Sequence, residues 1–235
     1  MNNYLLFIDT EASDLPKNWT LPFTAPDNWP HALQISWIIY DKHRVEVKRE
    51  DHYININEDV KISEPALNVH GITPAYLKEN GKDINQVLQL FINDLTFYNP
   101  LVIGHFVKMD YYVLGAELHR AGIKDVLENV PVFCTMITSG HIMQNTTSRQ
   151  LRLDELYNTL FYKELIHPHN ALYDALHAAD CYFELTDRGE ITPKMIEQQN
   201  KNSYKWRQPE VKQNGCMLLP LVFCLLAGIL ICYLI

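Results

Sequence analysis

Four acidic residues and one histidine stand where expected strands end and expected helices begin. Asp9 and Glu11 close an N-terminal apolar run, and because residues two apart on a strand point to the same face, both carboxylates can reach one metal ion. Asp110 falls in the first turn of an expected helix, whose positive end favours an anion. His169 and Asp174 lie at the start of another expected helix. Carboxylate oxygens suit Mg²⁺ and Mn²⁺, so these residues predict a site for hard divalent ions.

Each of these features also has an ordinary structural explanation. Two acids at a strand end are typical of a solvated loop, and an acid in a first helical turn often does no more than stabilise the helix. A buried strand, however, seldom ends on two charges that lack a partner. The order and spacing of all the motifs, rather than any single one, therefore indicate metal-dependent chemistry.

Apolar periodicity predicts the elements that position these residues. We expect strands, the second and third of them paired as a hairpin, over 4–9, 32–40, 45–56, 101–106 and 132–137. We expect helices over 84–95, about 107–120, 151–161 and 171–186, with a short helical piece from Pro193. A long loop rich in Pro, Asn and Trp is expected over 12–30. This order of elements predicts an α/β fold, a mixed sheet flanked by helices.

Taken together, the motifs resemble those of the DEDDh 3′-5′ exonucleases, the DnaQ-like family that includes the proofreading epsilon subunit of bacterial DNA polymerase III. The first motif spans 7–11 (FIDTE), the second runs from His105 to Asp110, and the third pairs His169 with Asp174. The related DEDDy branch needs a tyrosine four residues before the last aspartate, where this chain has Asn170. The resemblance covers about residues 4–188 and implies a ribonuclease H-like fold.

The resemblance implies an enzyme that hydrolyses phosphodiester bonds from the 3′ end of DNA with two divalent cations, Mg²⁺ or Mn²⁺, and releases nucleoside 5′-monophosphates. In that scheme Asp9 bridges both ions, while Glu11 and Asp174 complete the site of the attacking water. Asp110 supports the second ion, and His169 is the general base. Single-stranded DNA is the favoured substrate. An exoribonuclease or oligoribonuclease is the enzymatic alternative, and a membrane-tethered module that binds nucleic-acid ends with little turnover is the alternative from another class.

The chain departs from the family pattern beside the expected ligands. Ala12 lacks the hydroxyl that often contacts the terminal nucleotide, and Phe106 stands where an asparagine commonly follows the histidine. Met109 replaces an aromatic residue ahead of the aspartate. These departures leave the choice of substrate open. The residues expected to contact the substrate are Ala12, His70, His105 and Met109.

The charge of the chain argues against a protein that binds nucleic acid by charge alone. Its 235 residues include 20 Lys or Arg and 28 Asp or Glu, a net charge of −8, whereas such binding needs many cations on phosphates. With 47% hydrophobic and 20% charged residues, a collagen-like, coiled-coil or wholly disordered chain is also excluded. We therefore expect the substrate to be gripped by metal ions and by a pocket for the last nucleotides.

The C-terminal segment 216–235 is uncharged and apolar, and at about 1.5 Å per residue it spans roughly 30 Å of hydrocarbon. A buried helix is the alternative, but such helices usually show a polar face. The flank 191–215 carries five basic and two acidic residues, which favours the cytoplasmic side. We expect an exonuclease domain over 1–190 on the cytoplasmic side, a basic juxtamembrane linker over 191–215 and a single-pass transmembrane tail anchor in lipid over 216–235. No protein partner is indicated.

Overall fold

The computed structural model describes residues 3–142 and 149–207, without the side chains of 141–142 and 204–207. The expected transmembrane segment 216–235 lies outside the described residues. Among the helices that are described, none is both long enough and apolar enough to cross a bilayer.

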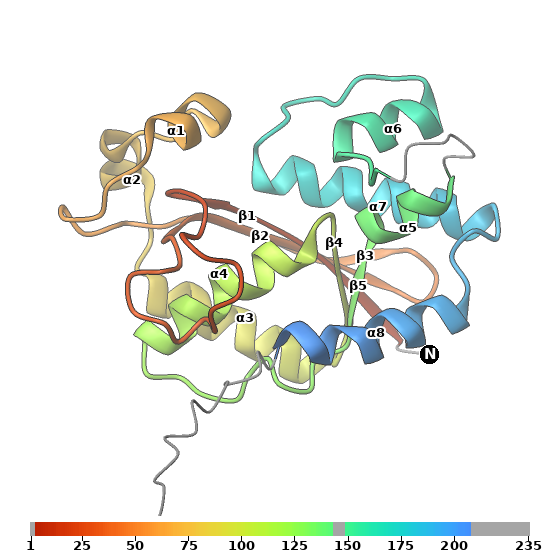
Figure 1. Cartoon of the computed structure of the whole chain (residues 1–235), viewed down its shortest axis with the longest axis horizontal. Helices are drawn as coiled ribbons and strands as arrows, with labels where there is room; N and C mark the ends of the chain where they lie inside the picture. Colours follow the sequence, from red (N-terminus) through yellow and green to blue (C-terminus); the bar gives the residue numbers. More distant parts are fainter. Residues whose placement is uncertain (1–2, 143–148, 208–235) are drawn as a thin grey trace, which may run out of the picture.

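A five-stranded mixed sheet forms the centre of the fold (Figure 1). Its strands are β1 (Tyr4–Ala12), β2 (Ala32–Asp41), β3 (Glu46–Tyr53), β4 (Leu101–Gly104) and β5 (Val132–Cys134). In space they run β3-β2-β1-β4-β5; β2 is antiparallel to β1 and β3, while β1, β4 and β5 are parallel. The expected mixed sheet and its hairpin are therefore confirmed. The three parallel strands bring their carboxyl ends to one edge, where ligands bind in folds of this kind.

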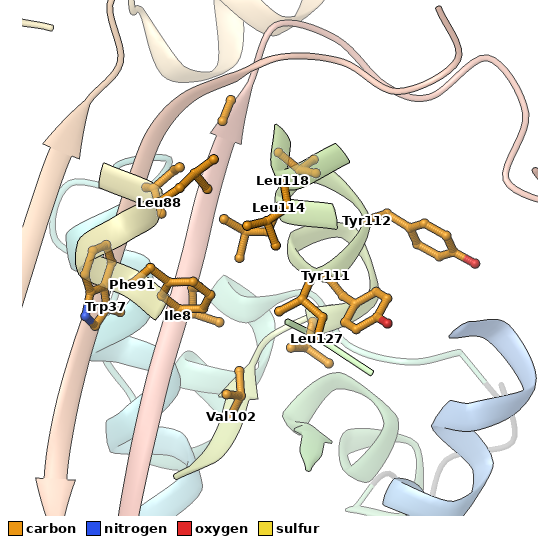
Figure 2. Packing of buried hydrophobic residues seen from close by; sticks show 14 of the residues in the cluster. Ile8, Trp37, Leu88, Phe91, Val102, Tyr111, Tyr112, Leu114, Leu118 and Leu127 are labelled. Carbon is orange, nitrogen blue, oxygen red and sulfur yellow. The ribbon is translucent and has the colours of Figure 1, made fainter. Parts of the chain in front are cut away.

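Helices cover both faces of the sheet. They are α1 (Glu64–His70), α2 (Pro74–Asn80), α3 (Ile84–Tyr98), α4 (Val107–Arg120), α5 (Thr135–Ile142), α6 (Leu153–Phe161), α7 (Ala171–Asp187) and α8 (Pro193–Arg207). Ile8 of β1 packs into a core with α3 and α4, and Figure 2 shows it beside Phe91 with Leu114 on the same face. Phe7 points the other way, into a core with α6 and α7. The strand alternation thus divides β1 between two cores.

Two short helices, α1 and α2, lie where we expected no element. Each has seven residues and a proline in its first two positions. Ser63 and Thr73 cap them, their side chains accepting hydrogen bonds from the main chain of the first turn. Helices this short show little apolar periodicity, so the Ser-x-Pro and Thr-Pro capping patterns were the only signals available.

The structure also corrects the expected elements near the C-terminus. The strand expected over 132–137 ends at Cys134, and α5 follows at once. α8 is longer than the short piece expected, and its Gln199 accepts a hydrogen bond from the Cys134 N–H (2.9 Å) and donates one to the Cys134 carbonyl (3.2 Å). Because α8 supplies partners for the outer strand β5, the folded unit continues through α8, into the range 191–215 that we expected to be the juxtamembrane linker.

Candidate active site

The carboxylates of Asp9 and Glu11 lie at the carboxyl end of β1, on the face that α7 covers. They share this face with Phe7, whose ring packs edge-on against Tyr182 of α7 at 5.6 Å. Asp174, in the first turn of α7, meets them there. One oxygen from each of the three carboxylates lies within 4.8 Å of the other two. The structure thus brings three of the four expected metal ligands together.

Asp110 reaches the same area from the other face of the sheet. It lies in the first turn of α4 and is buried, 3% exposed. Its Oδ1 accepts a 2.8 Å hydrogen bond from the hydroxyl of Thr10, which points away from its neighbours Asp9 and Glu11 because side chains alternate along a strand. Asp110 is near enough to raise the pKa of Asp9. The fourth expected ligand therefore flanks the three-carboxylate cluster.

Burial and mutual repulsion raise the pKa values of the site carboxyls. The pKa of Asp9 lies well above its usual 3.8, first through burial and then through repulsion by Asp110, Asp174 and Glu11. Burial is also the main cause that raises the pKa of Glu11 from 4.5 to about 8 and that of Asp110 from 3.8 to about 7. Among the side chains that the structure describes, no Lys or Arg pairs with these four acids. A cationic ligand would offset their charge.

The chemistry of the donor set fits a hard divalent cation. Oδ1 of Asp174 is buried and has no hydrogen-bond partner in the described part of the chain. The Nδ1 atom of His177 lies 3.9 Å away from it. The second oxygen, Oδ2, accepts a 3.0 Å hydrogen bond from the main-chain N–H of His169. A buried carboxylate oxygen without a partner, beside two further carboxylates, can serve Mg²⁺ or Mn²⁺, which prefer oxygen ligands.

His169 lies in the loop just before α7, at an open cavity beside the cluster. Its side chain is exposed, and its backbone has a left-handed φ of 61°. With Asp174, Arg152 and Glu164, it lines a cavity of about 540 Å³. A non-glycine residue held in the left-handed region often marks a functional constraint. The imidazole is therefore accessible next to a cluster ligand, as a general base must be.

Two polar residues that the sequence reasoning missed hold this loop. Buried Gln34 of β2 accepts a hydrogen bond from the Ala171 N–H (3.2 Å) and donates one to the Asn170 side chain (3.4 Å). Asn170 caps α7 and donates to the hydroxyl of Tyr53 (3.2 Å). The available signal was Gln34 itself, a polar residue inside an otherwise apolar expected strand.

Three of the residues expected to contact substrate are neighbours of site residues in the sequence or in space. Ala12 is buried at the end of β1. His70 ends α1, and its Nδ1 accepts a hydrogen bond from the Ile72 N–H (2.9 Å). Burial lowers the pKa of His70, a hydrogen bond to the Ala12 main chain raises it, and electrostatic repulsion by nearby His169 lowers it. Met109 is half-buried against the core of α3 and α4. Their contact with substrate stays a prediction.

His105, the fourth residue expected to contact substrate, is buried, and both of its ring nitrogens have partners. It is 9% exposed, its Nδ1 lies 2.9 Å from the Thr135 hydroxyl and its Nε2 lies 3.1 Å from the Leu151 carbonyl. Burial lowers its pKa to about 4, so the neutral ring donates to the carbonyl and accepts from the hydroxyl. Both ring nitrogens thus join β4 to α5 and to the segment before α6, and contact of His105 with substrate stays a prediction.

Solved structures of exonucleases share this fold. Escherichia coli Exonuclease I in complex with a dT13 oligonucleotide aligns with a TM-score of 0.66 at 15% identity over 83% of this chain and 43% of that chain. The nuclease domain of 3′hExo, a DEDDh family member bound to rAMP, aligns with a TM-score of 0.64 at 16% identity over 81% and 96%. A 3′-exonuclease that recognises the histone mRNA stem-loop aligns with a TM-score of 0.61 at 14% identity over 80% and 83%. This chain thus spans less than half the length of Exonuclease I.

The family is shown by sequence. A family model described as exonuclease (RNase T) matches residues 6–182, a range that includes every expected metal ligand and His169. No curated protein sequence matches the chain significantly. The matched range covers most of the chain and agrees with the expected DEDDh-type domain. The chain therefore belongs to the exonuclease family.

Proposed function

We propose that this protein is a 3′-5′ exonuclease that hydrolyses DNA with two divalent cations and releases nucleoside 5′-monophosphates. The observation that carries the proposal is the convergence of Asp9, Glu11 and Asp174 within 4.8 Å, together with the buried Asp174 oxygen that no described residue partners. When bound, divalent cations at such a site supply Lewis-acid stabilisation of the phosphoryl oxygens and lower the pKa of an attacking water.

Each residue of the site has its own task in this proposal. Asp9 is close enough to Glu11, Asp174 and Asp110 to be repelled by all three, so it would ligate both ions. His169 would take the proton from the attacking water, since its ring is exposed beside Asp174. The hydrogen bond from the His169 N–H to Asp174 fixes the base relative to a metal ligand. Thr10 orients Asp110.

DNA is the favoured substrate and RNA the second candidate. Exonuclease I, with a TM-score of 0.66, was solved with a dT13 oligonucleotide, and we favour single-stranded DNA on this similarity. The RNA candidate is favoured by 3′hExo, solved with rAMP, and by the 3′-exonuclease that recognises histone mRNA. The attack on phosphorus does not require either sugar, so contacts to the 2′ position decide between them.

Cleavage of matched strands tests this proposal. Single-stranded DNA and RNA of equal sequence, labelled at the 5′ end, are incubated with the protein in Mg²⁺, in Mn²⁺ or in chelator. We expect a metal-dependent ladder that shortens the DNA from its 3′ end. Asp9→Asn should abolish it, while Asp59→Asn, the same change at an exposed position outside the site, should not. A ladder on RNA alone would establish the second candidate, and no cleavage of either strand would refute both.

We further propose that segment 216–235 anchors the enzyme in a membrane, with the nuclease domain on the cytoplasmic side. The support is the uncharged apolar composition of the segment and the basic flank before it. A fusion of a fluorescent protein to the N-terminus should fractionate with membranes and become soluble when 216–235 is deleted. A full-length fusion that stays in the soluble fraction would refute the anchor.

A further inference from the structure

An aromatic surface with one lysine lies at the start of α4, the helix that carries Asp110 in its first turn. It consists of Trp19, Phe106 and Lys108, which we call the aromatic platform. The rings of Trp19 and Phe106 are 5.5 Å apart, and the Lys108 Nζ lies 5.7 Å from the ring centre of Trp19. Phe106 is 38% exposed and Trp19 is half-buried. The fold thus presents π faces and a cation to solvent, one helical turn from Asp110.

The backbone of Phe106 is held in an unfavourable conformation that exposes its ring. Phe106 is the N-cap residue of α4 with φ 66° and ψ 38°, and its side chain makes no capping hydrogen bond. Left-handed backbone is rare for a bulky aromatic residue, since its Cβ crowds the following carbonyl. A glycine or asparagine would suit this left-handed position better. Such outliers concentrate at ligand sites, which makes a binding role for the ring a natural explanation.

Trp19 is held in place by the loop that follows β1. Figure 1 shows this loop, coloured red to orange, beside α4. Trp29 stacks on Tyr112 of α4 with ring centres 4.1 Å apart and planes 3° apart, and Trp19 packs edge-on against Trp29 at 5.9 Å. Phe23 covers Gly115 of α4 so closely that a Cβ there would lie 2.8 Å from its ring. The loop is therefore pinned to α4, and Trp19 is preorganised.

The charge and shape of the platform fit a nucleic-acid strand. Within the described side chains, Lys108 pairs with no carboxylate, and its Nζ lies 5.7 Å from the ring centres of both Trp19 and Tyr112. Phe106 and Lys108 also line an open cavity of about 190 Å³ together with Gln150. Bases stack on aromatic side chains whatever their sequence, and an unpaired lysine beside them binds phosphate.

We propose that the aromatic platform stacks unpaired bases of the substrate strand just upstream of the scissile phosphate, with Lys108 on a phosphate. This inference rests on the proposed nuclease site. Phe106 and Asp110 belong to the same end of α4, so one nucleic-acid strand would contact both the platform and the site. It assigns the enzyme a single-stranded substrate, since bases paired in a duplex cannot lie on the rings.

The test uses the full chain in detergent and two octanucleotide probes, oligo(dT) and the same strand with abasic sites. Binding is measured by fluorescence anisotropy in chelator, where cleavage is suppressed. We expect Trp19→Ala and Phe106→Ala each to weaken oligo(dT) binding about 5- to 100-fold. Phe106→Leu should behave like Phe106→Ala, and Phe106→Tyr should restore binding, because the ring and not apolar volume is required. In turnover, the loss should appear in KM and not in kcat.

The abasic probe separates stacking from a general disturbance of the site. Abasic sites at the contacted nucleotides should weaken binding to the wild type by the same factor as the double variant Trp19→Ala/Phe106→Ala, and should not weaken binding to that double variant further. Lys108→Gln should lower the slope of log Kd against log salt by about 0.7. Phe97→Ala is the matched control: Phe97 is 79% exposed at the end of α3, next to Tyr98, which packs on Tyr4 at the opposite end of β1 from the cluster.

The inference would be overturned if Trp19→Ala and Phe106→Ala both bound oligo(dT) as tightly as the wild type does. It would also be overturned if abasic sites weakened binding to the double variant by as large a factor as they weaken binding to the wild type. A failure of the proposed nuclease function looks different. In that case wild type would not hydrolyse the p-nitrophenyl ester of thymidine 5′-monophosphate, whereas the binding measurements and their dependence on Trp19 and Phe106 would remain.

Discussion

Replacing Glu11 by glutamine should stabilise the metal-free protein while abolishing its activity. Glu11 is 9% exposed, and burial raises its pKa from 4.5 to about 8, with further repulsion from Asp174 and Asp110. The native state therefore binds more protons than the unfolded state between about pH 4.5 and pH 8, so stability falls as pH rises through this window. Glutamine has the same shape and no charge, which removes this dependence.

The size of the effect follows from the same pKa. In the native state Glu11 stays mostly protonated at pH 7, whereas in the unfolded state it ionises, because pH 7 lies about 2.5 units above its unfolded pKa. At about 1.4 kcal/mol per unit, this ionisation lowers the free energy of unfolding by on the order of 3 kcal/mol. For a domain of this size, that corresponds to a rise in Tm of roughly 6–12 °C in Glu11→Gln. Below about pH 4.5 the two proteins should melt together.

Thermal melts in chelator across this pH range measure the change in Tm, and the same melts in Mg²⁺ measure how much the cation stabilises each protein. Because a cation that binds only the native state stabilises it, Mg²⁺ should raise the Tm of the wild type and much less that of Glu11→Gln. The control is Glu197→Gln: Glu197 is exposed and paired with Lys201, so this change should alter Tm little and leave the Mg²⁺ response intact. A Glu11→Gln variant that melts below the wild type at neutral pH in chelator would refute the reasoning.

Single substitutions at three other residues in or near the site have different expected effects. His169→Ala should lower kcat about 10²- to 10⁴-fold yet keep the Mg²⁺-induced rise in Tm, and added imidazole should restore part of the rate; a lost Mg²⁺ response would instead make His169 a structural residue. Thr10→Val removes the hydroxyl that lowers the pKa of Asp110, so kcat at pH 7 should fall roughly tenfold and recover partly at higher pH; an unchanged pH profile would contradict this. His105→Ala leaves the Thr135 hydroxyl and the Leu151 carbonyl without their partner, so chemical denaturation should show a loss of about 2–4 kcal/mol, whereas a raised KM at unchanged stability would return His105 to substrate binding.

The alternation of side chains between the two faces of β1 allowed part of the site to be predicted from the sequence. Asp9 and Glu11 had to share a face, and the first-turn acid of α7 had to meet them once the sheet order was known. The same alternation sends Thr10 to the other face, where it holds Asp110. The expected ligands were thus placed by local rules, and the resemblance supplied their order.

Contacts between segments that are far apart in the chain could not be predicted from the sequence. His105 lies in a motif next to the site, yet its partners Thr135 and Leu151 are about 30 and 46 residues away, so nothing local marks it as structural. Gln34 reaches Asn170 across 136 residues. Most of α8 was assigned to a linker because this flank is basic and precedes the apolar tail. Its hydrogen bonds to β5 and the packing of Ile196 against the core show that it belongs to the fold.

The most direct test of the central claim is the anomalous scattering of Mn²⁺ in crystals of the protein soaked with manganese. The convergence of Asp9, Glu11 and Asp174 predicts an anomalous peak at coordination distance, roughly 2.2 Å, from oxygens of these three carboxylates, and its loss in Asp174→Asn. A fully occupied peak elsewhere, or none at this cluster in a protein that still cleaves DNA with Mn²⁺, would contradict the account.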